Sequence, residues 1–224
     1  MTILTCSCIG FLVGGIPFGY LVGRLILRDD IRNHGSGNIG ATNVARVIGW
    51  KWGSLVLLLD ALKGLLPTWG AVCVAQRYEP ASMHVHIAVA TGLCAILGHM
   101  YPVYLQLRGG KGVATALGVV LILAPKAMLV AAAVFAVVAG ITRLVALGSI
   151  LAALAFGVLQ LSLMGGSALD VANLSLTIFA VVVPLLIIWR HRANIVRLTK
   201  GTELTVTAPV AEDEISESEP GEGG

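Results

Sequence analysis

The chain has 224 residues, of which 57% are hydrophobic and only 12% are charged. Soluble globular domains carry about 25% charged residues, so this composition excludes an ordinary soluble domain and indicates a membrane protein. The formal net charge of +3 is too small to indicate a partner by its total, and we expect no nucleic-acid partner. The four cysteines lie in apolar segments, where they predict buried thiols rather than a zinc site or a disulfide framework.

The first apolar segment, residues 3–23, has no basic residue before Arg24. A secretory signal begins with a positively charged region, so we interpret this segment as a retained membrane span. Its positive charge comes only after it, which predicts that the N-terminus lies outside.

Further apolar segments follow at residues 52–76, 81–107, 112–142, 144–169 and 171–189. A helix needs about 20 apolar residues to cross the hydrocarbon core of a membrane. The segment 112–142 is much longer than that, and the sequence Ala124-Pro125-Lys126 predicts a turn inside it. This segment therefore reads as two short helices.

The basic residues decide between one helix and two in this segment. Two helices place nearly all the Lys and Arg clusters on one side of the membrane, as the positive-inside rule prefers. We therefore predict an all-α polytopic membrane protein with about seven transmembrane helices, its N-terminus outside and its C-terminus cytoplasmic. The outside segments would be 1–2, 77–82, 124–127 and 165–170, and the cytoplasmic ones 24–51, 101–112, the turn near 143 and 190–203.

The domain organisation follows from a change in composition near the C-terminus. Residues 1–203 are predicted to form a single integral membrane domain. Residues 204–224 are acidic, contain Pro, Gly and Ser, and are poor in aromatic residues. Such a segment cannot bury enough apolar surface to fold, so we predict a disordered cytoplasmic tail.

The cytoplasmic stretch "NHGSGNIGATNVAR", residues 33–46, contains a G-x-G-x-x-G pattern. A dinucleotide site needs a buried strand before this pattern, but the preceding "LRDDIRNH" is polar, and the acid that follows, Asp60, lies inside a membrane helix. A plain glycine turn would leave the many hydrogen-bond donors unexplained. Donors crowded among flexible glycines favour a phosphate site. Its candidate residues are Gly35, Ser36, Gly37, Asn38, Gly40, Thr42, Asn43 and Arg46.

A second stretch, "GHMYPVYLQLRGGKGVATALG" at residues 98–118, has the same character. Its glycines precede a helix, whose N-terminus carries free amides and a positive dipole. The full Walker A spacing is missing, because Lys111 is followed by Gly112 rather than by Ser or Thr. We predict an anion site but no separate ATP site, while Arg108 could equally be a cationic flank of the helix. The candidate residues are Gly109, Gly110, Lys111, Gly112 and Thr115.

The third stretch, "WRHRANIVRLTKGTE" at residues 189–203, leaves the last span. Helical spacing places His191 and Asn194 on one face, although His191 could simply cap the helix. We interpret Arg192 and Lys200 as lipid-headgroup anchors.

The second span carries a further pair of ionisable residues, Asp60 and Lys63, spaced three residues apart. Ionisable groups at such a depth are costly and usually paired. A structural ion pair and a direct chemical role are both open.

Several catalytic patterns are absent from the chain. No histidine is followed by an aspartate at the His-x4-Asp spacing, and neither a G-x-S-x-G elbow nor a run of carboxylates for Mg²⁺ is present. The candidate site is rich in cations and donors but poor in bases. It suits a reaction between two phosphate-bearing substrates, in which the protein positions groups and stabilises charge.

The stretches "GSGNIGATNVAR", "DALKGLLP", "GHMYPVYLQLRGGKGVAT" and "RHRANIVRLTKGTE" resemble motifs of the acyl-phosphate:glycerol-3-phosphate acyltransferases of the PlsY type. The resemblance covers roughly residues 1–203 and does not include the acidic tail. It implies a seven-helix enzyme of the bacterial cytoplasmic (inner) membrane, with its active site on the cytoplasmic face. Such an enzyme transfers a fatty acyl group from acyl phosphate to glycerol 3-phosphate, giving lysophosphatidic acid and phosphate in phospholipid biosynthesis, without cofactor or metal. Membrane lipid and the soluble enzyme that makes acyl phosphate are the implied partners.

The resemblance also implies roles for individual residues. Ser36, Thr42 and Arg46, with the glycine amides, would hold the acyl-phosphate group, and Lys111 would bind phosphate. Ser36, Arg46 and Lys111 are the implied catalytic residues. His99 would support the second loop, and His191, Asn194 and Ser149, the last in "RLVALGSI", would contact substrate. The departing phosphate could accept the proton of the attacking hydroxyl.

Two other readings remain open from the sequence. A transporter or flippase for a phosphorylated solute would also combine apolar helices with cationic loops, but the cations cluster on one side, with no chain of them across the bilayer. A non-catalytic membrane scaffold would not need so many phosphate donors on one side.

Overall fold

The structure is a computed structural model that describes residues 1–205, and helices are the regular elements of that part of the chain. The predicted tail lies outside the described residues from residue 206 onward. The elements are α1 (Thr2–Gly14), α2 (Phe18–Ile26), η1 (Ile31–Asn33), α3 (Ala41–Ile48), α4 (Trp50–Tyr78), α5 (Ala81–Met100), η2 (Val103–Leu105), α6 (Val113–Leu123), α7 (Pro125–Thr142), α8 (Val145–Met164), η3 (Gly165–Leu169), α9 (Leu174–Arg190) and α10 (Arg192–Thr199).

The all-helical membrane architecture is confirmed, but the number of spans is only partly settled. Five helices are long and apolar enough to cross a membrane, and the pair α9 and α10, bent by 59°, makes a sixth if it counts as one span. The predicted break is present, because α6 ends at Leu123 and α7 begins at Pro125. Helix α6 has 11 residues, which reach about 16 Å, roughly half of a hydrocarbon core. The predicted count of seven therefore depends on whether α6 counts as a crossing.

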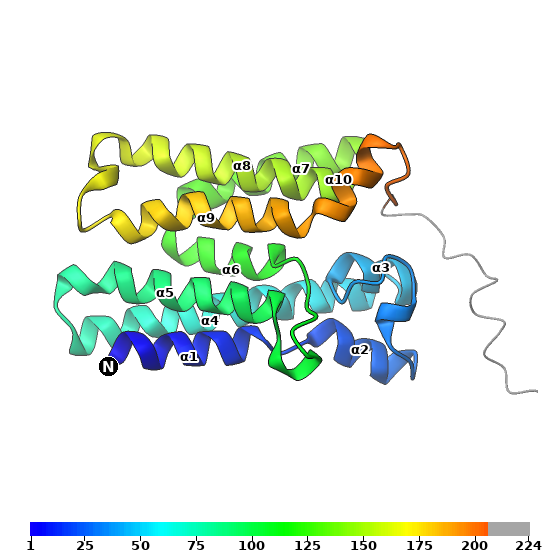
Figure 1. Cartoon of the computed structure of the whole chain (residues 1–224), viewed down its shortest axis with the longest axis horizontal. Coiled ribbons are helices and arrows are strands. Elements are labelled where there is room, and N and C mark those ends of the chain that lie inside the picture. The colour runs from blue at the N-terminus through cyan, green and yellow to red at the C-terminus, as the bar shows by residue number, and fades with distance from the viewer. Residues whose placement is uncertain (206–224) are drawn as a thin grey trace, which may run out of the picture.

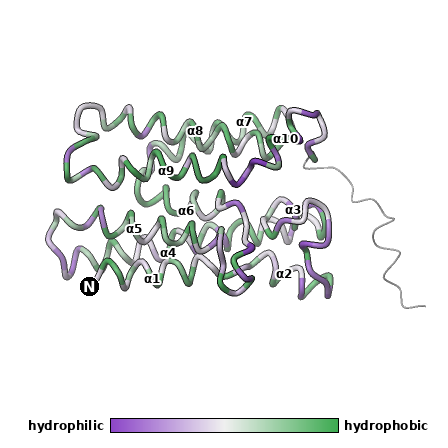
Figure 2. Tube along the Cα trace, in the orientation of Figure 1, coloured by the Kyte–Doolittle hydropathy of each residue, from purple (hydrophilic) through white to green (hydrophobic). Residues whose placement is uncertain are grey.

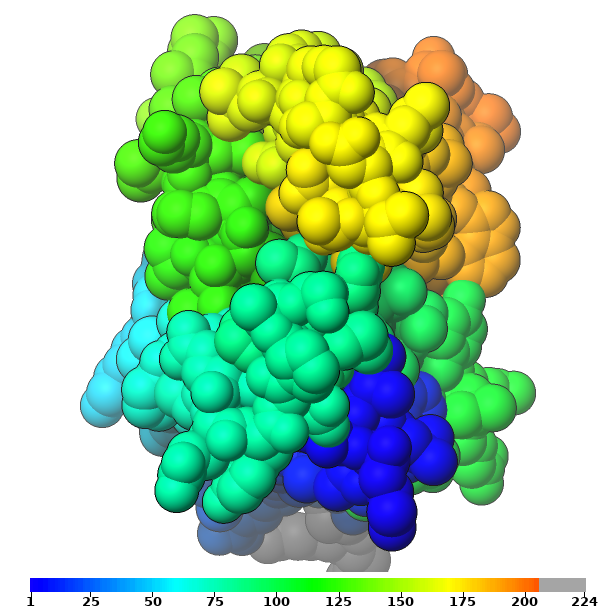
Figure 3. All heavy atoms as spheres, turned by 90° about the vertical axis from the view of Figure 1, so that its left-hand side faces the viewer, coloured from blue at the N-terminus to red at the C-terminus, as the bar shows by residue number. Residues whose placement is uncertain are grey.

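The helices form two groups that lie side by side (Figure 1). One group contains α1 to α5, in which α1 packs along α5 and α4 packs against α5 and α3. The other contains α7 to α10, in which α8 packs between α7 and α9. Helix α6 lies between the groups, and the end-on view shows α8 and α9 above α4, α5 and α1 (Figure 3). The groups are thus joined mainly where α9 meets α5 and α6.

A continuous apolar core holds the two groups together. It runs from Ile96 of α5 and Val119 of α6 to Phe156 of α8 and Phe179 of α9, all buried. The rings of Phe156 and Phe179 meet edge to face, with centroids 6.1 Å apart. Because this core fills the junction, the groups are held at a defined spacing.

Two close helix contacts position the start of α6. A methyl group on Gly64 of α4 would overlap the carbonyl of Thr115, and one on Gly118 of α6 would overlap the carbonyl of Ala61. Glycines at both crossing points let the helix backbones approach closely, as in other membrane helix pairs. Thr115, predicted as a donor in the second loop, is therefore buried against α4.

The basic segments gather at one end of the molecule. Figure 2 shows hydrophilic residues concentrated where α2, α3 and α10 lie, together with the loop before α6. The N-terminus, the α4–α5 turn and the α8–α9 connection lie at the opposite end. Three of the four predicted outside segments thus lie together, whereas the fourth, residues 124–127, follows the short α6 and includes the buried Ala124 and Ala127. The assignment of the basic end to the cytoplasm stays a prediction.

The Asp60–Lys63 pair is formed inside this bundle, with Nζ of Lys63 2.7 Å from Oδ1 of Asp60. Lys63 also donates a 2.7 Å hydrogen bond to the carbonyl of Ile16, in the turn between α1 and α2. Both side chains are buried, and the ion pair offsets the cost of burying the two charges. Lys63 therefore ties α4 to the turn that leads into α2, which is a structural role.

Candidate active site

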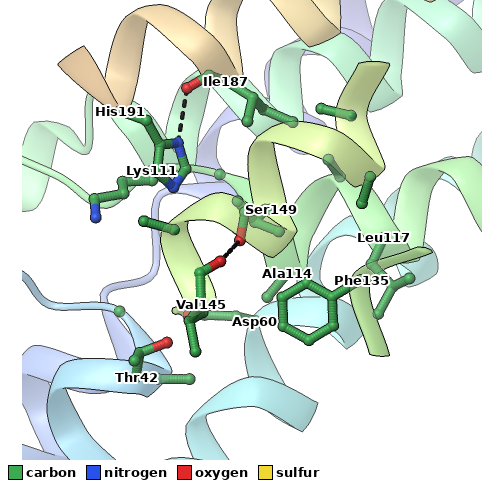
Figure 4. Close-up of a pocket in the computed structure, with 18 of the residues that line it drawn as sticks. Thr42, Asp60, Lys111, Ala114, Leu117, Phe135, Val145, Ser149, Ile187 and His191 are labelled. Carbon is green, nitrogen blue, oxygen red and sulfur yellow. Dashed lines mark hydrogen bonds between the residues drawn. The ribbon is translucent and has the colours of Figure 1, made fainter. Parts of the chain in front are cut away.

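A cavity of about 400 Å³ lies between the two groups of helices, at the end that carries the basic segments (Figure 4). Its lining divides into a polar end and an apolar arm. The polar end is formed by Ser36, Asn38, Thr42, Asn43, Arg46, Asp60, His99, Lys111, Ser149, His191, Asn194 and Glu203. The apolar arm includes Leu57, Leu117, Val120, Met128, Ala131, Ala132, Phe135, Ala153, Phe156 and Val183.

Most of the residues predicted from the sequence meet in this one cavity. The three polar stretches, separated by up to 150 residues of chain, all contribute, and Gly40 and Gly112 line it with their backbones. Four predicted glycines are not part of the lining, namely Gly35, Gly37, Gly109 and Gly110. These four shape the loops that carry the lining residues.

The first loop is organised by the buried side chain of Asn43. Its Oδ1 accepts hydrogen bonds from the amide of Ser36, at 2.7 Å, and from the Ser36 hydroxyl, at 3.1 Å. Its Nδ2 donates to the carbonyls of His34, at 3.0 Å, and Ile31, at 3.3 Å. The side-chain amide of this one α3 residue therefore holds three positions of the preceding segment in place.

The glycines of this loop allow its backbone conformation rather than supply free hydrogen-bond donors. Gly35 and Gly37 have positive φ values of 59° and 69°, which favour glycine. The amide of Gly37 donates to the carbonyl of His34, and that of Gly40 donates to Oδ1 of Asn38, at 2.8 Å. The predicted contribution of these two amides to anion binding is corrected by this geometry, because both already have acceptors within the loop.

This loop lines the cavity with the side chains of Ser36, Thr42 and Arg46, and the Ser36 hydroxyl donates to Oδ1 of Asn43. The guanidinium of Arg46 donates to the carbonyl of Thr205, with Nη2 at 3.1 Å. Burial lowers the pKa of Arg46 from its ordinary value, although arginine stays charged. Residues 204 and 205, which the sequence assigned to the tail, thus lie against the site, and Leu204 lines the cavity.

The second loop is held against the end of α5. The amides of Gly109 and Gly110 donate to the carbonyls of Met100 and His99, at 3.2 and 3.1 Å. A methyl group on Gly110 would overlap Nε2 of the His99 ring, so only glycine fits there. The loop then turns through Gly112, with a φ of 84°, into α6, and Lys111 reaches the cavity.

Lys111 lies among other cations in a largely buried place. Burial is the main cause that lowers its pKa to about 8, and the charges of Arg197, Arg46 and Arg190 lower it further. The carboxylate of Glu203 acts in the opposite direction. Lys111 is therefore a cation whose charge depends on pH near neutrality.

His99 and Asp60 lie beneath this loop, and both are buried. Nδ1 of His99 is 3.7 Å from Oδ1 of Asp60, which also pairs with Lys63. Asp60 thus belongs at once to the ion pair in the bundle and to the wall of the cavity. The sequence had left open whether this residue is structural, and its position serves both the helix packing and the site.

The α9–α10 junction supplies the third wall. Nδ1 of His191 donates to the carbonyl of Ile187, at 2.8 Å, so a neutral ring presents Nε2 as an acceptor. Asn194, one turn later, donates through Nδ2 to Oε1 of Glu203, at 2.7 Å. Its amide oxygen is then the group available as an acceptor. Ser149 of α8 completes the wall, with its hydroxyl donating to the carbonyl of Val145 at 2.8 Å (Figure 4).

Glu203 is a site residue that the sequence analysis did not select. Its second carboxylate oxygen accepts a 2.8 Å hydrogen bond from Nε of Arg197, so the side chain joins α10 to the segment that follows it. The only available signal was an acid at the end of a strongly basic stretch. The apolar arm was also missed as a cavity, because its residues come from five separate apolar helices, α4, α6, α7, α8 and α9.

The fold and cavity define a class, a polytopic helical membrane protein with a cationic pocket that continues into an apolar arm. A sequence model of the family described as "Glycerol-3-phosphate acyltransferase" matches residues 4–201. The chain belongs to this family, the PlsY type of glycerol-3-phosphate acyltransferase, whose place is in phospholipid biosynthesis.

The chain is similar to individual members along nearly its whole length. It is 51% identical over 196 residues to a glycerol-3-phosphate acyltransferase of Myxococcus xanthus (strain DK1622), covering 87% of this chain and 95% of that protein. It is 46% identical over 193 residues to one from Syntrophotalea carbinolica, covering 86% and 92%.

Two solved structures share the fold. Both are crystal structures of PlsY, an integral membrane glycerol 3-phosphate acyltransferase. The glycerol 3-phosphate form matches with a TM-score of 0.80 and 38% identity over 92% of this chain and 96% of that one. The lysophosphatidic acid form matches with a TM-score of 0.76 and 37% identity over 92% and 95%.

Proposed function

We propose that this acyltransferase takes its acyl group from acyl phosphate and transfers it to glycerol 3-phosphate, giving lysophosphatidic acid and phosphate. One observation supports this donor above all: the cationic end and the apolar arm form a single cavity. In acyl phosphate the fatty chain is attached directly to a phosphate group, so its site needs these two environments side by side. Acyl-CoA would place a long polar carrier between them.

The donor is positioned by the two glycine loops. Ser36, Thr42 and Arg46 hold the phosphate of acyl phosphate, and Lys111 faces them from the second loop. These groups suit a phosphate because hydroxyls, an ammonium and a forked guanidinium all donate hydrogen bonds. The acyl chain extends into the arm, where Phe135 is among the lining residues.

The acceptor binds from the α9–α10 side. Nε2 of His191 and the amide oxygen of Asn194 accept hydrogen bonds from the glycerol hydroxyls, and Ser149 adds a further contact. The attacking hydroxyl oxygen forms a bond to the acyl carbon while the bond from that carbon to the phosphate oxygen breaks. The hydroxyl proton passes to the departing phosphate. The protein contributes proximity and stabilisation of developing charge, and Lys111 and Arg46 are the cations placed to do so.

The orientation in the membrane follows from the chemistry and the charges. We place the basic end, and with it the active site, on the cytoplasmic face of the bacterial inner membrane, with seven spans and the N-terminus outside. Glycerol 3-phosphate is then reached from the cytoplasm, and a soluble enzyme that makes acyl phosphate could deliver it there. A cysteine at position 126, in the α6–α7 turn, should react with an impermeant thiol reagent from the outside. Reaction from the cytoplasm alone would overturn this topology.

The donor assignment is tested with purified protein in detergent micelles. Palmitoyl phosphate and glycerol 3-phosphate should give lysophosphatidic acid and one phosphate per turnover, whereas palmitoyl-CoA and palmitoyl-acyl-carrier protein should give little product. Equal rates with the thioesters would overturn the acyl-phosphate assignment. Absence of product with every donor, together with uptake of glycerol 3-phosphate into vesicles, would favour the transporter.

A further inference from the structure

Arg190, the last residue of α9, donates to two consecutive backbone carbonyls of the second loop. Its Nη2 donates to the carbonyls of Gly109 and Gly110, at 2.8 Å each, and its Nε donates to the carbonyl of Gly110, at 3.1 Å. Its guanidinium also lies over the ring of Tyr101, with Cζ 5.5 Å from the centroid. One side chain thus holds the backbone of the second loop at two consecutive carbonyls.

The identity of the acceptors is the informative feature. Within residues 1–205, Arg190 forms no ion pair with a carboxylate, and its guanidinium instead donates hydrogen bonds to two backbone carbonyls. The carbonyls satisfy the half-buried guanidinium, and its hydrogen bonds hold loop backbone rather than an anion. Arg190 does not line the cavity, which separates it from the residues that meet substrate.

The position of Arg190 in the fold gives this contact a consequence. Lys111, one residue after Gly110, lies in the loop between α5 and α6, whereas His191 and Asn194 belong to the group α7 to α10. Arg190 directly precedes His191 and grips the two residues that directly precede Lys111. This side chain therefore connects the two sides of the polar end directly.

We propose that Arg190 is a positioning residue that fixes Lys111 relative to His191 and Asn194, and so sets the spacing between the donor and acceptor sides of the pocket. The proposal rests on the proposed function, since it assigns those sides to the two substrates. A displacement of about 1 Å in a positioned group can cost about 10² in rate. Arg190 acts through Lys111 and does not touch the reacting atoms.

Arg192 provides a matched control, because it is the same residue type two positions later. It is exposed, donates to the carbonyl of Trp189 at 3.3 Å and lies over the Trp189 ring, 4.7 Å from its centroid. These contacts stay within its own turn of helix. A general effect of positive charge at the membrane surface would affect both arginines alike.

The experiment is a double-mutant cycle on kcat/KM. Arg190→Ala should lower kcat/KM by about 10²-fold, mainly through kcat, whereas Arg192→Ala should change it by less than about 3-fold. Arg190→Lys should recover only part of the loss, because a single ammonium cannot replace the fork on both carbonyls. Added to Lys111→Ala, the Arg190→Ala change should have almost no further effect, since residues that act through one another are not additive.

Each outcome decides the matter. If Arg190→Ala and Lys111→Ala multiply their effects, or if Arg192→Ala is as damaging as Arg190→Ala, Arg190 does not act through Lys111 and the proposal is wrong. The thermal midpoint of each purified variant is measured alongside, and Arg190→Lys replaces Arg190→Ala in the cycle if the alanine variant does not fold. If wild-type protein prefers another acyl donor, the proposed function fails, but the same cycle run with that donor still tests Arg190.

Discussion

The two glycine loops of the site each place a cation in the wall of the cavity, but different parts of the protein hold them in shape. Residues 33–46 are held together from within, because Asn43 bonds to the amide of Ser36 and to two carbonyls of the same loop. The loop that carries Lys111 is held from outside, by the end of α5 and by Arg190, which lies 80 residues further along the chain. A glycine-rich stretch can therefore present a cation either as a self-contained unit or as a part clamped between helices.

This difference explains how far the sequence could predict the site. The first loop carries its own organiser within a dozen residues, so its donors could be named as a group. The second loop shows only its glycines and Lys111, because its organiser belongs to a different span. Nothing local in the sequence distinguishes Arg190 from Arg192.

The fold shows the same division between local and distant causes. The all-helical membrane class follows from composition, and the break before Pro125 follows from proline chemistry. The apolar arm depends on how several helices pack, and the close crossing of α4 and α6 at Gly64 and Gly118 is a contact that hydropathy does not encode. The capture of Glu203 by Asn194 and Arg197 needs the chain to fold back after α10, and a pattern of helical faces gives no sign of that return.

The largest expected effect on activity comes from removing the cation that each loop presents to the cavity. Arg46→Ala and Lys111→Ala should each lower kcat by about 10²–10³, because each removes a preorganised donor at a site where charge develops. Lys111→Arg should also fail, since a planar fork does not replace a compact ammonium in a tight glycine turn. Activity is measured as release of phosphate from palmitoyl phosphate in the presence of glycerol 3-phosphate.

Arg192→Ala and Lys200→Ala are the controls for this pair, since both residues are exposed and basic. Both variants should keep near wild-type turnover. If they lose as much activity as Lys111→Ala, surface charge in general is what matters, and neither loop is a dedicated phosphate site.

The next effect tests whether the first loop depends on its internal organiser. Asn43→Asp keeps the shape of the side chain but replaces the Nδ2 donor with a carboxylate oxygen. The carbonyls of Ile31 and His34 then face an acceptor instead of a donor. Unpaired buried groups cost about 1–3 kcal/mol, so the loop should open and kcat should fall by roughly 10–10². The thermal midpoint in detergent should fall as well. A variant with wild-type kinetics would show that the loop keeps its form without Asn43.

A smaller effect concerns the packing of the second loop. Gly110→Ala would place a methyl group against the His99 ring and displace the residue before Lys111, lowering kcat/KM by about 10-fold. Gly70→Ala in α4 is the matched control, because a methyl group there meets no atom within 4 Å. It should leave the kinetics unchanged and should not lower the thermal midpoint. Equal kinetics for the two variants would show that the loop has room to shift without consequence.

The smallest expected effect is a change in pH dependence that links the second loop to Glu203. The pKa of Lys111 is lowered to about 8, chiefly by burial. In the proposed function the ammonium is the form that binds phosphate. Since kcat/KM reports the free enzyme, it should hold below pH 8 and fall as the pH rises through that value. The charged groups that act on Lys111 are Glu203 and the guanidiniums of Arg197, Arg46 and Arg190, and only Glu203 raises its pKa.

Glu203→Gln should therefore move the alkaline limb of kcat/KM to lower pH, because removing an anion makes the neighbouring ammonium easier to deprotonate. Glu79→Gln is the control, since Glu79 follows α4 at the opposite end of the molecule. The plateau of the Glu203→Gln variant should also fall, because glutamine can satisfy Asn194 or Arg197 with its one oxygen but not both. A lower plateau with an unmoved limb would mean that Glu203 serves the geometry of α10 alone. In that case the second loop would depend only on the end of α5 and on Arg190, and the contrast between a loop held from within and one held from outside would become sharper.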